Sequence, residues 1–156
     1  PAFSARPELD GEPAECGALA RCQAQPAVRD LARRDRIVAR AFSRVAEFAM
    51  VLRADSTVGR LETAVLGPGE GAAIGEMARG VLLHAVRLEG ERIADYAIVA
   101  PTEWNFHPQG ALYRELEGRP ARSARAARRA LDFAAATLDP CVALEPSLET
   151  AEAPDA

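Results

Sequence analysis

The longest regular pattern of apolar residues in the chain lies between residues 35 and 54. Apolar side chains recur there every three or four residues, the period of one helix face; they are Val38, Ala41, Phe42, Val45, Phe48, Ala49 and Leu52. Arg36, Arg40 and Arg44 are spaced four apart on another face, with Glu47 as an available ion-pair partner. The spacing therefore predicts a helix over 35–54 whose arginine face is exposed to solvent.

Two short runs rich in Val, Ile and Leu follow, at residues 81–88 and 92–99. Because only Glu89-Gly90-Glu91 separates them, the pattern predicts an antiparallel β-hairpin in which Tyr96 and Ile98 share one face. The preceding segment 66–71 holds three glycines and a proline and is predicted to be a loop, without the lysine of a phosphate-binding loop. The proline-bounded segment 102–108 is predicted to be a structured loop anchored by Trp104.

Two further helices are predicted after this loop. One covers residues 109–117 and stops at Gly118, and a longer one covers residues 121–137, which are dense in Ala and Arg. The longer helix carries a basic stripe, interpreted as a solvated or partner-docking face rather than a nucleic-acid site: Arg122, Arg125, Arg128 and Arg129. Since a residue before proline disfavours the helical region, Asp139-Pro140-Cys141 is predicted to leave the helix as an extended segment.

These elements predict an α+β fold, mainly helical with a small antiparallel β-hairpin. The 156 residues are 49% hydrophobic and 27% charged, which fits one globular domain. Residues 1–14, with three prolines, are predicted to be a flexible lead-in, and residues 15–144 the folded domain. Residues 145–156 carry four acidic residues and no base, and are predicted to be an acidic disordered tail.

Charge and cysteine content narrow the classes of partner and ligand. The net charge of −4 argues against nucleic acid or a membrane as partner, and no apolar run reaches the roughly 18 residues of a membrane helix. Three cysteines without a leader segment favour reduced thiols in the cytoplasm. Cys16 and Cys22 lie too far apart for a zinc hairpin, and a lone His84 in a strand is typical of the core. Cys141, presented after Asp-Pro, suits a soft metal ligand.

Four short motifs occur in a recognisable order: GALAR at 17–21, EMARGVLLH at 76–84, YAIVAPTEWN at 96–105 and DPC at 139–141. Together they resemble the C-terminal half of the nickel-iron hydrogenase large subunit, over about residues 15–144. Within that family, the sequence APTEWNFHP and the incomplete C-terminal cysteine motif most resemble those of hydrogenase maturation proteins of the HupK and HoxV type. The resemblance implies a large-subunit-like domain that forms one half of a larger helical fold.

Departures from the family pattern concern the metal ligands. The second C-terminal cysteine, which bridges nickel and iron in catalytic subunits, is Leu144 in this sequence, and the following family histidine is Ser147. The N-terminal ligand motif of the family, Arg-x-Cys-Gly-x-x-Cys, is absent from this sequence. A complete nickel-iron site therefore cannot be built from these residues, so no catalytic residue is assigned and nickel is not expected.

The surroundings of the iron's diatomic ligands are retained. The resemblance places them at Ala78, Arg79, Pro101, Thr102, Asp139 and Cys141. It implies that Arg79 and Thr102 hydrogen-bond the cyanides of an Fe(CN)2(CO) fragment, which is chemically sensible for an anionic ligand. Asp139 is expected to pair with Arg79 and aim it, and Cys141 to provide one thiolate. Ala78 replaces a proline of the family.

The function implied is that of a hydrogenase accessory protein, a scaffold or chaperone that binds the Fe(CN)2(CO) part of the cofactor transiently. Its expected partners are hydrogenase maturation proteins and the hydrogenase large subunit, and no enzymatic activity is expected. Two alternatives stay open at this point. In the first alternative, the chain is a fragment of a catalytic nickel-dependent large subunit. In the second, it is a metal-free docking homologue.

Overall fold

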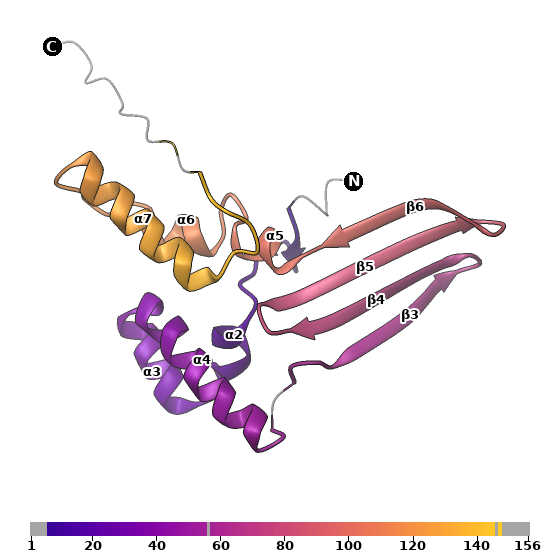
Figure 1. Ribbon diagram of the computed structural model, residues 1–156, viewed down its shortest axis with the longest axis horizontal. Helices are drawn as coiled ribbons and strands as arrows, with labels where there is room; N and C mark the ends of the chain where they lie inside the picture. The colour runs from indigo at the N-terminus through magenta and orange to yellow at the C-terminus, as the bar shows by residue number, and fades with distance from the viewer. Residues whose placement is uncertain (1–5, 56, 146, 148–156) are drawn as a thin grey trace, which may run out of the picture.

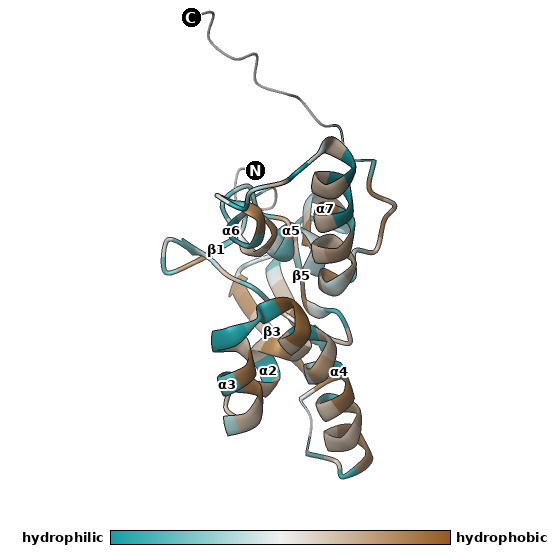
Figure 2. Ribbon diagram, turned by 90° about the vertical axis from the view of Figure 1, so that its left-hand side faces the viewer, coloured by the Kyte–Doolittle hydropathy of each residue, from teal (hydrophilic) through white to brown (hydrophobic). Residues whose placement is uncertain are grey.

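The computed structural model describes residues 6–55, 57–145 and 147, and it places two groups of helices at one end of a long antiparallel sheet (Figure 1). The first group consists of α2 (Ala18–Cys22), α3 (Pro26–Arg34) and α4 (Arg36–Leu52). The second consists of α5 (Pro101–Asn105), α6 (Ala111–Leu116) and α7 (Ala124–Leu138). Figure 2 shows the two groups one above the other. The predicted α+β class is confirmed.

Helix α4 matches the predicted helix, but the side that it buries is not the apolar one. Asp35 caps its start, since the Asp35 carboxylate accepts a hydrogen bond of 3.0 Å from the Val38 amide. The buried side carries mainly small or polar residues, namely Ile37, Ala39, Arg40, Ser43 and Glu47. On the opposite side, Val45 is 69% exposed. The prediction of a solvated arginine face was wrong for Arg40, which is 3% exposed because buried carboxylates surround it.

The sheet has four strands in the order β3-β4-β5-β6, each antiparallel to its neighbour. Their bounds are Leu61–Gly67 (β3), Glu70–Met77 (β4), Gly80–Glu89 (β5) and Arg92–Val99 (β6). The predicted hairpin is confirmed as β5 and β6. The predicted loop over 66–71 was wrong except for a tight turn, where Gly69 adopts φ 74°. Figure 1 shows that the sheet projects away from the helices.

One small cluster of buried side chains stabilises the first group of helices, and the second group has a buried tryptophan. Leu19, Cys22, Val28 and Ala39 form the cluster between α2, α3 and α4. In the second group, Trp104 is buried, in agreement with its predicted role as an anchor. A core of this size buries little apolar area. Polar contacts between the helices and strands are therefore important for holding them in their relative positions.

The segment after β6 begins with helix α5, where the sequence predicted a structured loop over residues 102–108. Pro101 stands in its first turn, where the fixed φ of proline suits a helix start. The Glu103 carboxylate accepts a hydrogen bond of 2.6 Å from the Ala100 amide, which satisfies a backbone group at this end. The proline that suggested a loop therefore begins a helix. The two later predicted helices are confirmed as α6 and α7, with ends shifted by one to three residues.

The two ends of the predicted domain also differ in detail. Within the predicted lead-in, β1 (Glu8–Leu9) and β2 (Glu12–Pro13) form a short antiparallel pair. Asp139 ends α7 in the left-handed conformation, φ 55° and ψ 60°, so the prediction of an extended residue before Pro140 was wrong. The predicted acidic tail falls outside the described residues except at 145 and 147. No helix within the described ranges is long and apolar enough to cross a membrane.

Candidate functional site

Arg79 lies on the turn that joins β4 to β5, and this turn packs closely against the segment before α2. Gly80 adopts φ 133°, and a Cβ atom at Gly80 would overlap the Cys16 sulfur. Gly17 adopts φ 109°, and a Cβ atom there would lie 3.0 Å from the Arg79 carbonyl oxygen. Glycine is required at both positions by the positive φ and by the close approach. The two glycines thus fix the backbone from which the Arg79 side chain projects.

Arg21 of α2 binds the same turn from the helical side. It is 8% exposed, and it donates hydrogen bonds of 3.1 Å to the Met77 carbonyl and 2.9 Å to the Ala78 carbonyl. The carboxylates of Glu47 and Glu76 pair with the same guanidinium. Burial alone would lower the pKa of Arg21, but hydrogen bonds to Glu47 and Glu76 outweigh it and raise that pKa. The guanidinium therefore stays charged and ties α2, α4 and the sheet together.

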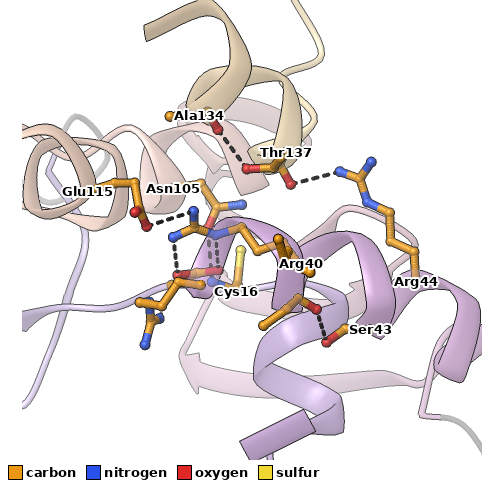
Figure 3. A network of polar contacts seen from close by, with 12 residues as sticks. Cys16, Arg40, Ser43, Arg44, Asn105, Glu115, Ala134 and Thr137 are labelled. Carbon is orange, nitrogen blue, oxygen red and sulfur yellow. Dashed lines mark hydrogen bonds and ion pairs between the residues drawn. The ribbon is translucent and has the colours of Figure 1, made fainter. Parts of the chain in front are cut away.

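Arg79 forms the centre of the candidate site together with Asp139. Its Nε donates a hydrogen bond of 3.1 Å to Asp139 Oδ2, and the two side chains are 50% and 42% exposed. A second guanidinium, of Arg44, lies 3.8 Å from the same carboxylate oxygen and donates to the Thr137 carbonyl at 3.0 Å (Figure 3). The Arg79–Asp139 pair that the motifs suggested is thus present, between residues 60 positions apart.

Thr102 and Cys141 join this site from two other elements. The Cys141 amide donates a long hydrogen bond of 3.5 Å to Thr102 Oγ1. Because Asp139 precedes Cys141 by two residues, the end of α7 brings the ion pair and the start of α5 into one neighbourhood. Pro101 is buried at this start, and its carbonyl accepts a hydrogen bond from Cys16 Sγ at 3.8 Å. The predicted site residues therefore converge, and their roles toward a ligand stay a prediction.

A narrow cleft of about 30 Å³ opens beside the ion pair, lined in part by Cys16, Ala78, Arg79, Asn105 and Asp139. This volume holds one or two water molecules, so a larger ligand must lie at the mouth of the cleft. Burial raises the pKa of the Cys16 thiol to about 11, so that thiol is protonated at neutral pH. The Cys141 thiol is exposed, whereas Cys16 is partly buried and Cys22 is buried, so Cys141 is the most accessible of the three thiols to a metal.

A buried ion network forms part of the wall of the cleft and explains why Arg40 faces inward (Figure 3). The Arg40 guanidinium donates to both Glu15 carboxylate oxygens, at 2.9 and 3.0 Å, and to Glu115 at 3.2 Å. Burial alone would raise the pKa of Glu15, but hydrogen bonds from Arg40 and Arg36 outweigh it and lower that pKa. The network connects α4, α6 and the segment before α2 through charged hydrogen bonds.

Several residues of this neighbourhood were not singled out from the sequence. Arg21 and Asn105 lie within the GALAR and YAIVAPTEWN motifs, and their position in these motifs could have marked them as candidate site residues. Asn105 is 3% exposed, and its Oδ1 accepts a hydrogen bond of 2.9 Å from the Cys16 amide (Figure 3). Glu15 and Arg40 lie 25 positions apart, and nothing in their spacing indicates a pair. Cys16 was set aside as a ligand, yet it lines the cleft.

The donor set limits what the site can bind. Within the part of the chain that the structure describes, no three His, Cys, Asp or Glu side chains gather in a group that could hold a metal ion. The described residues therefore offer a guanidinium, a hydroxyl and one exposed thiol. This set fits an anionic ligand that accepts hydrogen bonds and takes one soft metal bond, rather than a bare cation.

Comparison with protein families matches residues 61–143 to the family described as nickel-dependent hydrogenase. The match covers 83 of the 156 residues, from the first strand of the sheet to the segment after α7. The chain therefore belongs to the nickel-dependent hydrogenase family, which confirms the resemblance drawn from the motifs.

Similar curated proteins carry names from hydrogenase maturation. The hydrogenase expression/formation protein HupK of Bradyrhizobium diazoefficiens is 37% identical over 148 residues, covering 90% of this chain and 40% of the relative. HupK of Rhizobium leguminosarum bv. viciae is 38% identical, covering 99% of this chain and 43% of the relative. HoxV of Cupriavidus necator is 44% identical over 92 residues, or 56% of this chain and 24% of the relative. The chain thus spans less than half the length of these relatives.

A solved structure shares the fold. The Ni-Fe-Se hydrogenase from D. vulgaris Hildenborough, in the reduced state, superposes with a TM-score of 0.63 and 23% identity. The superposition covers 87% of this chain and 36% of the hydrogenase chain. At this identity the likeness establishes a hydrogenase-like fold alone.

Proposed function

We propose that this chain belongs to a hydrogenase maturation protein that binds the Fe(CN)2(CO) fragment transiently and passes it to a hydrogenase large subunit. The observation that carries the proposal is the Arg79–Asp139 ion pair, placed beside the Thr102 hydroxyl and the exposed Cys141. The names of the relatives support an accessory role. Other hydrogenase maturation proteins would deliver the fragment.

The donors of the site suit the outer atoms of such a cargo. The cyanide nitrogens of the fragment are hydrogen-bond acceptors that carry negative charge. Asp139 holds Nε of Arg79, which leaves the two Nη groups to donate toward a ligand at the cleft mouth. Thr102 adds a hydroxyl donor, and the Cys141 thiolate offers one bond to iron. Hydrogen bonds to a charged group are worth about 1.5–3 kcal/mol each, so these contacts support a reversible complex.

The same donor set disfavours the catalytic alternative. Leu144 stands where catalytic subunits carry the bridging cysteine, and a hydrocarbon side chain cannot bind nickel or iron. With one exposed thiol from the described residues, the chain holds its cargo more weakly than a closed cluster site would. Weak binding suits a carrier, because a carrier must release what it binds.

The test measures iron in a chimera in which this chain replaces the matching segment of the Bradyrhizobium diazoefficiens relative, co-expressed anaerobically with hydrogenase maturation proteins. Arg79→Leu is expected to reduce iron per chain by about tenfold or more at limiting iron, the equivalent of one charged hydrogen bond. Cys141→Ser is expected to reduce it at least as much, because it removes the thiolate bond to iron. The matched control is Arg125→Leu on α7. Arg125 lies 14 residues before Asp139, or about 20 Å along the helix, so its loss should leave iron unchanged.

Two outcomes would count against the proposal. If both site variants retain the iron of the unsubstituted chimera, the assigned residues do not bind the fragment. If the chimera holds no iron in any form while it still binds maturation proteins, the metal-free docking alternative describes the protein better.

A further inference from the structure

An arginine-lined surface lies where the two groups of helices meet (Figure 2). It consists of two adjoining hollows of about 650 and 490 Å³, whose walls share Glu15, Arg33 and Arg36. We call the surface formed by the arginines of both hollows the arginine trough: Arg29, Arg33, Arg34, Arg36, Arg114 and Arg119. Three carboxylates also line it, so its lining carries a net charge of +3, whereas the whole chain carries −4.

Three of these guanidinium groups are available to a ligand. Arg29 and Arg34 are exposed, and within the described ranges neither has a hydrogen bond or an ion pair. Arg33 lies 3.8 Å from Asp30, and the two side chains are 73% and 63% exposed. An exposed pair of this kind contributes little stability, so an anionic ligand can replace Asp30 as the partner of Arg33.

The buried ion network holds two further arginines of the trough in place. Arg36 donates a hydrogen bond of 2.8 Å to Glu15, and Arg119 pairs with Glu115. Both carboxylates also bind the buried Arg40, so much of their negative charge is already balanced. The Arg36 and Arg119 side chains remain 53% and 56% exposed. Their remaining N–H groups are therefore positioned before a ligand arrives.

The lining favours carboxylates over a nucleotide or a phosphate. Its uncharged side chains are small, aliphatic or amide-bearing, and none of the described lining residues offers an aromatic face on which a base could stack. A helix start attracts phosphate groups, but at the start of α4 the Asp35 carboxylate already accepts the hydrogen bond of the Val38 amide. Arginine side chains alone are left to bind an anion here.

The arginines are spaced for an extended peptide. Arg29 and Arg33 are four residues apart on α3, or about 6 Å along the helix axis. Carboxylates on alternate residues of an extended chain are about 6.6 Å apart. Acidic residues at alternate positions can therefore each meet one arginine, from Arg29 in the smaller hollow to Arg114 in the larger one.

We infer that the arginine trough binds an extended segment of a separate protein that carries Glu or Asp at alternate positions. Contacts between guanidinium groups and carboxylates are charge-assisted and often bidentate, which gives such a segment both affinity and orientation. The inference is independent of the iron fragment, because Arg79, Thr102 and Cys141 are not part of the trough.

The test uses a fluorescein-labelled peptide of alternating Glu and Ser with four glutamates, whose dissociation constant is measured by fluorescence anisotropy at low salt. Binding is measured for this chain and for the chimera with the Bradyrhizobium relative. The site variant combines Arg29→Gln with Arg34→Gln, and the matched control combines Arg125→Gln with Arg129→Gln on α7. All four arginines are exposed and both variants lower the net charge equally, but Arg125 and Arg129 lie outside the trough. Circular dichroism checks that each variant is folded.

In the chain and in the chimera, the site variant is expected to bind the peptide at least ten times more weakly, and the control variant less than twofold more weakly. A peptide with Gln in place of Glu should not bind. Equal weakening in the two variants would show a general charge effect and overturn the inference. Binding by the chain but not by the chimera would overturn it too, because the remaining polypeptide of the relative would then cover the trough.

Three other results would also overturn the inference. No binding of the peptide by either protein is the first. Displacement of the labelled peptide by inorganic triphosphate at a lower concentration than by the unlabelled peptide would assign the trough to a phosphate ligand. Binding that is absent until residues 145–156 are removed would assign it to the acidic residues of this chain itself.

Discussion

Replacement of Arg21 by methionine is expected to lower the free energy of unfolding by about 3–5 kcal/mol. Arg21 and Glu47 have side chains that are 8% and 11% exposed, so solvent screens their interaction little. Methionine keeps much of the apolar stem but leaves the Glu47 carboxylate without its guanidinium partner. Removal of one member of a buried ion pair costs about 3–5 kcal/mol, because the remaining charge stays buried. The carbonyls of Met77 and Ala78 also lose a donor.

Urea unfolding followed by circular dichroism measures this loss, provided that the transition is two-state and the m-value is unchanged. The double variant Arg21→Met with Glu47→Leu should recover part of the stability, because it removes the unpaired carboxylate. Arg128→Met is the control, since its ion pair with Asp132 is 46% and 53% exposed and is worth about 0.3–0.5 kcal/mol. A loss below about 1 kcal/mol for Arg21→Met, or no recovery in the double variant, would refute the reasoning.

Three further predictions concern the same neighbourhood. Gly80→Ala should lower the free energy of unfolding by about 1–3 kcal/mol more than Gly90→Ala does, as measured by thermal unfolding. Both glycines have positive φ, but only at Gly80 would the added Cβ overlap the Cys16 sulfur. Iodoacetamide at pH 8 should label Cys141 and leave Cys16 unlabelled, as measured by mass spectrometry. Burial raises the pKa of Cys16 to about 11, so its thiol stays protonated until the pH approaches that value. Equal labelling of the two cysteines would contradict the burial of Cys16. The lowered pKa of Glu15 stabilises the fold above pH 4.5, and this contribution is lost as the pH falls below 4.5. Between pH 6 and pH 3, the urea midpoint of Glu15→Gln should therefore fall less steeply than that of the unsubstituted chain.

The orientation of α4 shows a limit of periodicity as a guide to the fold. The spacing of apolar residues predicted the helix and the residues that share its face, and both are correct. Periodicity does not say which face turns inward. Arg40 is buried because Glu15 and Glu115, from distant parts of the chain, pair with it. The apolar residues opposite stay exposed in this chain, as Val45 does.

The sheet was predicted only where its residues have high β-propensity. Strands β5 and β6 are rich in Val, Ile and Leu and were found, whereas six of the eight residues of β4 are Gly, Ala or Glu, which are depleted in strands. Strand β3 was not predicted either, although four of its seven residues are Leu, Thr or Val. Strand β4 has low β-propensity, and its hydrogen bonds to β5 hold it in the sheet.

The candidate site was predictable where motifs pointed to it. The Arg79–Asp139 pair followed from the order of the motifs, and the structure contains it. The conformation of Asp139 did not follow, because the residue before a proline was expected to be extended, whereas aspartate is one of the few residues besides glycine that also adopt the left-handed region, as it does here. Cys16 could not be placed, since its contact with the turn depends on the two glycines that allow close packing.

In the function proposed above, the site binds the iron fragment and not a complete nickel-iron cluster. Infrared absorption in the cyanide and carbonyl stretching region, recorded on the anaerobic chimera together with its iron and nickel content, tests this claim most directly. Cyanide and carbonyl bands are expected with iron and without nickel, and they should be lost in Arg79→Leu and in Cys141→Ser. Iron with an equal amount of nickel, or bands that persist unchanged in both variants, would contradict it.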